Sequence, residues 1–315
     1  MALPYILQPK KDKTSQLLEI ASQDPYFAEL IHDLVDFGYE IKFPFFGQVG
    51  LYVPHSISTE HLDTPEKQQA FANGFVQSLA NENAPKAKFR LCASLGANVN
   101  AHTFLHEIMH FYQDMLGLYL IPLLEQGVYP AHLDLQSFVN AFLFCEAWAQ
   151  TEAICASWRL KEKGINGPWL GAMASADWRD LAKQYEGDQD ATAIFNAWYD
   201  GKHRGFYEKH AGMVYVSITD SYERNAPKAS KDEIGEALRK LELPMLLIKI
   251  PKKKMPHYLK NLDWTDKRYT AITNKHVELT IKNQKDMFRE CNNTDIQDIK
   301  IGTPPYLWNR LRGAG

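Results

Sequence analysis

The stretch "HTFLHEIMHFYQD", residues 102–114, places three histidines and two acids among apolar side chains. On an α-helix, residues i and i+4 lie one turn apart on the same face, so His106 and His110 can direct their imidazoles at one point in space. Glu107 is displaced by about 100° around the helix, which puts its carboxylate beside that point. Burying these polar groups without a partner would be costly, so the stretch predicts a helix that presents two histidines to a metal ion.

A third metal ligand has to come from elsewhere, because a catalytic zinc usually takes three protein ligands and keeps its fourth position for water. Residues 131–164 repeat apolar side chains at helical spacing and contain Glu146 and Glu152. Glu146 falls on the apolar face that carries Phe138 and Phe142, where an unpaired carboxylate would be expensive. Glu152 lies about 120° further round the helix, where it could face solvent or pair with a basic group. Glu146 is therefore the favoured ligand.

Other residues of the opening stretch are poorly placed to bind the same ion. His102 and Asp114 extend the histidine face by one turn each way, but four residues advance the helix by about 6 Å. We expect His102 to lie early in the helix, and Asp114 to be either a surface acid or an acid that touches the site indirectly. The metzincin pattern is excluded, because Gln113 and Leu116 stand where it requires glycine and histidine.

"HEIMH" at 106–110, followed by "EAWAQ" at 146–150 on a later helix, resembles the gluzincin branch of the zincin metallopeptidases. The chain also resembles a group of bacterial metallopeptidases whose activity is uncharacterised. The resemblance is specific over about residues 88–160, and it extends more loosely from residue 25 onward. It makes a zinc peptidase the leading hypothesis.

The resemblance implies that His106, His110 and Glu146 hold one zinc ion per chain. It assigns Glu107 as the general base, and it implies a small mixed sheet over the active-site helix whose edge strand pairs with an extended substrate. Many gluzincins have an acid four residues after the glutamate ligand that holds a zinc-bound histidine. This chain departs from that pattern with Gln150.

The predicted reaction is peptide-bond hydrolysis by a metal-activated water, with Glu107 as proton acceptor and a peptide or protein as substrate. The tetrahedral oxyanion would need a further hydrogen-bond donor. Candidates for that donor, or for a residue supporting the site, are Gln150 and four residues of the stretch 202–216: His203, Tyr207, His210 and Tyr215.

The pattern of apolar residues predicts an α+β fold that is predominantly helical, with a small lobe that contains the strands followed by a helical lobe. The expected strands are 39–45, 49–54 and 88–94, and the expected early helices are 24–38 and 64–79. From His102 to about Arg224 the chain is expected to be helical, with breaks near 127–130, 164–168 and 201.

Charge and turn signals suggest a boundary near residue 225. Residues 226–315 contain 18 Lys and Arg against 11 Asp and Glu, whereas residues 1–225 carry ten more acids than bases. We predict a metallopeptidase domain at 1–225 and a basic accessory region at 226–315. The two parts could attract each other. Alternatively, the basic region could meet a partner, and the protein would then be a catalytically inactive zincin-fold binding or effector module.

Composition limits the remaining classes. A chain of 315 residues with 45% hydrophobic and 23% charged residues is typical of a globular protein. Its four cysteines are too scattered for a disulfide framework, and Cys145 and Cys155 are expected on one helix. No nucleic-acid motif is present, and the longest uncharged apolar run, at 115–124, is too short to span a bilayer. Without a signal peptide at its start, the chain is expected in the cytoplasm, or exported by a route that needs none.

Overall fold

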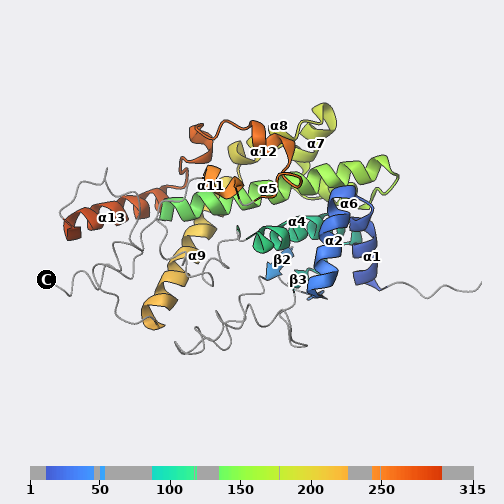
Figure 1. The fold of residues 1–315 in the computed structure, drawn as a ribbon, viewed down its shortest axis with the longest axis horizontal. Coiled ribbons are helices and arrows are strands. Elements are labelled where there is room, and N and C mark those ends of the chain that lie inside the picture. Colours follow the sequence, from blue (N-terminus) through green and yellow to red (C-terminus); the bar gives the residue numbers. More distant parts are fainter. Residues whose placement is uncertain are drawn as a thin grey trace, which may run out of the picture.

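The computed structural model describes residues 12–45, 50–53, 87–116, 118, 135–176, 178–225, 243–248 and 250–292. These residues are mostly helical and contain one small three-stranded sheet (Figure 1). The predicted α+β, predominantly helical class is thus confirmed. The helix predicted at 64–79 and the break predicted near 127–130 lie outside the described residues.

Two of the described helices precede the first strand, and the others follow the last strand. Their bounds are α1 Lys13–Ser22, α2 Pro25–Phe37, α4 Ala97–Met115, α5 Leu135–Glu162, α6 Gly167–Ala174, α7 Arg179–Asp188, α8 Ala191–Asp200, α9 Arg204–Asn225, α11 Leu243–Leu247, α12 His257–Asn261, the 3-10 helix η4 Lys267–Tyr269 and α13 Lys275–Asn292. The predicted breaks near Gly164 and Gly201 are confirmed. Two further breaks, after α6 and after α7, were not predicted.

The sheet consists of β1 (Tyr39–Lys42), β2 (Gly50–Val53) and β3 (Ala87–Leu91) in the order β1-β3-β2. β1 pairs with β3 in parallel, while β2 pairs with β3 antiparallel with Tyr52 opposite Phe89. The sheet is therefore mixed, as predicted. Side chains of β3 alternate between buried and exposed, and the buried ring of Phe89 packs on Phe104 of α4 at 5.6 Å between centroids.

Helix α4 lies between the sheet and the long helix α5 (Figure 1). Every residue from Asn100 to Asp114 is buried, including all three histidines of the opening stretch. A helix that is enclosed on all sides exposes no polar face to water, so each of its polar side chains needs a partner within the protein. The fold therefore leaves only internal groups as partners for the buried polar side chains of α4.

Helix α6 approaches the start of α4 closely at Gly171. A Cβ atom added there would lie 2.0 Å from the carbonyl oxygen of Asn98 and 2.6 Å from its carbonyl carbon. Gly171→Ala is expected to destabilise the chain by about 1 to 3 kcal/mol, because the two backbones must separate. Denaturant unfolding measures this loss.

Gly205→Ala in α9 is the matched control for this helix packing. A Cβ atom at Gly205 meets nothing within 4 Å, so the substitution should leave stability equal or slightly higher. Equal unfolding midpoints for Gly171→Ala and the parent would contradict the close approach of α6 to α4.

The described residues after 242 pack against the helices before them. Leu246, Tyr258 and Leu259 belong to the same hydrophobic core as the residues of α4 and α5. Basic residues of this part also pair with acids of the earlier chain. Lys254 lies 3.1 Å from Asp33, and Arg268 lies 3.1 Å from Asp200. These pairs support attraction between the two parts, while the boundary near 225 remains a prediction.

The structure describes the side chains of three of the four cysteines, while the apolar run at 115–124 lies largely outside the described residues. Cys92, Cys145 and Cys155 are free and buried, and the latter two share α5. Each helix in the described part of the chain is too short or too polar to span a bilayer.

Candidate metal centre

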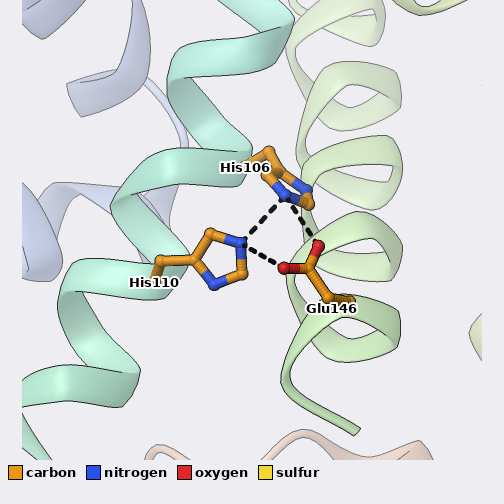
Figure 2. A group of neighbouring side chains, drawn as sticks. All are labelled: His106, His110 and Glu146. Carbon is orange, nitrogen blue, oxygen red and sulfur yellow. Dashed lines mark hydrogen bonds and ion pairs between the residues drawn. The ribbon is translucent and has the colours of Figure 1, made fainter. Parts of the chain in front are cut away.

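His106, His110 and Glu146 meet in the interface between α4 and α5 (Figure 2). The Nε2 atoms of the two histidines are 3.0 Å apart. The carboxylate of Glu146 reaches both rings, with Oε2 at 3.5 Å from Nε2 of His106 and Oε1 at 3.5 Å from Nε2 of His110. All three side chains are buried.

The cluster has the spacing and donor types of a metal site. Two ligand atoms at about 2.0–2.1 Å from a tetrahedral ion lie about 3.3 Å from each other. The two histidine nitrogens are 3.0 Å apart, and each carboxylate oxygen of Glu146 lies 3.5 Å from one of them, so these distances fall on either side of that value. Two imidazole nitrogens and a carboxylate suit a first-row transition metal, and three ligands leave a fourth position open. The residues therefore fit a catalytic metal ion.

The charged groups of this cluster shift one another's pKa values. Burial opposes protonation of His110, but the neighbouring Glu146 carboxylate outweighs it and raises the pKa of His110 to about 9. Burial would raise the pKa of Glu146, yet the two histidines hold that pKa well below its ordinary value. The buried carboxylate is thus stabilised by positive charge, which a cation between the three side chains would also supply.

Glu107 lies beside the cluster and is held by the sheet. Its Oε2 accepts a hydrogen bond from the backbone N–H of Tyr52 in β2, at 2.6 Å. Burial raises the pKa of Glu107, although the nearby His106 and His110 oppose the rise. The hydroxyl of Tyr52 donates to Asp114 at 2.6 Å. Asp114 is buried, so the expectation of a surface acid is wrong, and its contact with Glu107 runs through Tyr52.

The other ring nitrogen of His110 contacts a residue that sequence reasoning did not assign. Nδ1 of His110 lies 2.9 Å from Oε1 of Gln113, and Nε2 of Gln113 donates to the carbonyl oxygen of Cys145 at 2.8 Å. Gln113 follows His110 by three residues, which places both on one helix face. That spacing was the available signal for this contact.

A family model described as "Putative metallopeptidase family (DUF6782)" matches residues 71–239, more than half of the chain. The chain belongs to this family. No curated protein and no solved structure matches it. Within the chain, the match to the metallopeptidase family spans β3, α4 and α5, and so contains the whole His106, His110 and Glu146 cluster. Membership implies a metal-dependent peptidase.

Glu152, the alternative third ligand, lies away from the cluster. It is buried beside Tyr258 of α12 and near Arg159, so the expectation that it might face solvent is wrong. Burial raises the pKa of Glu152 to about 7, although Arg159 opposes the rise. Arg159 itself pairs with Asp24 at 2.6 Å. In this member of the metallopeptidase family, α5 presents Glu146 and not Glu152 to the histidines.

His102 and Gln150 contact each other rather than the cluster. Nε2 of Gln150 lies 3.3 Å from Nε2 of His102, whose Nδ1 lies 2.9 Å from the hydroxyl of Ser157. Burial, with a smaller effect from His106, lowers the pKa of His102 to about 3, so its ring is neutral. His102 lies near the start of α4, as predicted.

The four candidates from residues 202–216 lie on α9 or in the turn before it. Tyr207 packs on Trp198, and Tyr215 is fully buried against Phe138. The ring of His210 lies 5.8 Å from that of Phe142, which precedes Glu146 by one turn of α5. His203 lies in the turn before α9. The cluster of potential metal ligands among the described residues contains neither His203 nor His210.

Proposed function

We propose that this member of the metallopeptidase family is a zincin-type, zinc-dependent peptidase. His106, His110 and Glu146 would hold one zinc ion, and Glu107 would act as the general base. The observation that carries the proposal is the convergence of three buried side chains, whose ligand atoms all lie within 4.8 Å of one another. When bound, zinc supplies Lewis acidity that lowers the pKa of water and polarises the scissile carbonyl.

The environment of Glu107 suits proton transfer. Its pKa is raised by burial, and a base whose pKa moves toward neutrality can both accept and return a proton. The backbone N–H of Tyr52 donates a hydrogen bond to Oε2, which fixes the orientation of the carboxylate. We propose that Oε1 accepts the proton of the attacking water, and that Glu107 then passes it to the leaving amine.

The sheet supports a peptide as the substrate. Among the described strands, β2 lies at one end of the sheet, and the backbone N–H of Tyr52 reaches Glu107. A strand at the edge of a sheet can bind an extended peptide through main-chain hydrogen bonds. We propose that the substrate lies along β2, which would bring its scissile bond to the cluster.

Among the candidates for an oxyanion donor, His210 has the most support. It is partly exposed and packs on Phe142, which lies one turn before Glu146. Gln150 and Tyr215 are committed to buried contacts with His102 and Phe138. We propose that His210 stabilises the oxyanion.

Metal removal tests this function. The purified chain is expected to contain one zinc ion and to hydrolyse members of a peptide library. Three protein ligands suffice to hold the ion, and its fourth coordination position stays free for water. Treatment with 1,10-phenanthroline should abolish hydrolysis, and added Zn²⁺ should restore it. Metal analysis and peptide cleavage are measured on the same samples.

Two results would contradict the proposal. One is a chain that binds no zinc at equimolar Zn²⁺. The other is peptide hydrolysis that continues after the metal has been removed and verified absent.

A further inference from the structure

We infer that Gln113 is a positioning residue of the metal centre, which fixes the tautomer of His110 and joins α4 to α5 beside Glu146. The inference rests on the proposed function, since it assumes that His110 and Glu146 bind a metal. It assigns a role to a residue that the zinc-site pattern in the sequence leaves out.

The tautomer follows from the two hydrogen bonds of one amide. A carbonyl oxygen only accepts, so the contact of Gln113 with the Cys145 carbonyl at 2.8 Å requires the amide nitrogen at that end. The amide oxygen therefore faces His110, where it lies 2.9 Å from Nδ1. Because an amide oxygen only accepts, Nδ1 must carry the proton. When the ring loses its second proton to bind a metal, its lone pair therefore lies on Nε2, the atom that faces His106 and Glu146.

The same side chain also fixes how the two ligand-bearing helices meet. Gln113 is fully buried, and Cys145 directly precedes Glu146 in α5. One end of the amide thus holds a proposed ligand of α4, while the other holds the backbone next to a proposed ligand of α5. A partner of this kind orients a metal-binding histidine and raises its basicity.

His106 differs from His110 in this respect. Its Nδ1 is buried and has no hydrogen-bond partner within the described part of the chain. Gln150, which stands where many gluzincins have the acid that orients a histidine ligand, contacts His102 instead. Within the described residues, Gln113 is therefore the residue that orients one of the two histidines through its Nδ1, and that histidine is His110.

Gln113→Met tests the inference, because methionine keeps the length and volume of the side chain and removes both hydrogen bonds. Zinc affinity, measured by competition with a chromogenic chelator, is expected to fall by about 10- to 100-fold, the usual cost of losing such a partner. In the Co²⁺-loaded chain, the visible d–d bands should shift, since they report the geometry of the ligands.

Ser157→Ala is the matched control. It removes the partner of a histidine Nδ1 at the same 2.9 Å distance and in the same helix interface, but at His102, outside the cluster. Zinc affinity and the Co²⁺ spectrum should stay as in the parent. An equal loss of affinity in Ser157→Ala would show that any disturbance of this interface weakens the site, and would overturn the inference.

Gln113→Glu separates orientation from space filling. A carboxylate still accepts from Nδ1 of His110 but cannot donate to Cys145, so affinity should recover relative to Gln113→Met. The assigned role is overturned if zinc binds Gln113→Glu no more tightly than Gln113→Met.

A parent chain that binds no zinc overturns the proposed function and this inference together. A parent that binds one ion, with Gln113→Met unchanged, overturns the inference alone.

Discussion

Replacing Glu107 with glutamine is expected to lower peptide hydrolysis by about 10²- to 10⁴-fold, the usual worth of a positioned general base. The glutamine keeps the size of the side chain, and its amide oxygen can still accept the Tyr52 N–H that now binds Oε2. His106, His110 and Glu146 remain free to hold zinc. Initial rates on a cleaved peptide and zinc content are measured together.

Glu152→Gln is the control for this loss of activity. Glu152 is also a buried glutamate with a raised pKa, but it lies beside Tyr258 and Arg159, away from the cluster. It should hydrolyse peptides like the parent. Full activity in Glu107→Gln would contradict the role of Glu107 as base, and loss of zinc from it would indicate a structural role.

The parent chain in the same assay separates the enzyme from the alternative of an inactive binding module. A parent that holds zinc and cleaves no member of the peptide library would favour the module. Two basic residues of the region after 225 already pair with acids of the same chain, Lys254 with Asp33 and Arg268 with Asp200. These pairs argue against a basic region whose charges all serve to bind a partner. Hydrolysis that depends on Glu107 would favour the enzyme.

The sequence was sufficient to predict the parts of the cluster that depend on helical spacing. His106 and His110 share a face because they are one turn apart, and the structure brings their Nε2 atoms to 3.0 Å. Glu146 could be chosen because it interrupts an apolar face of α5. Local periodicity also predicted the three strands of the sheet, since alternation along β3 is visible in the sequence.

Contacts set by the relative position of two elements could not be predicted in this way. Gln113 reaches Cys145 only because α4 and α5 pack at one particular register. The Tyr52 N–H reaches Glu107 across 55 residues of chain. The burial of Asp114 and Glu152 likewise depends on β2 and α12 covering them, which no pattern within α4 or α5 indicates.

Glu146→Ala is expected to weaken zinc binding by more than the roughly 10- to 100-fold that loss of an orienting partner costs. Both carboxylate oxygens of Glu146 lie 3.5 Å from a histidine Nε2, so its removal leaves only two ligands for the ion. Two histidines are fewer than the three protein ligands of a catalytic zinc site. Zinc affinity is measured by chelator competition on chain whose folding has been checked by thermal unfolding.

Glu152→Ala completes this test, because the two glutamates share α5, are both buried and lose the same atoms. Glu152 is six residues further along the helix and faces Tyr258, so its removal should leave zinc affinity as in the parent. Strong binding in Glu146→Ala, with loss in Glu152→Ala, would reverse the assignment of the third ligand. Loss in both variants would mean that zinc binding follows the integrity of α5 and not the carboxylate of Glu146, since the two residues contact different parts of the molecule.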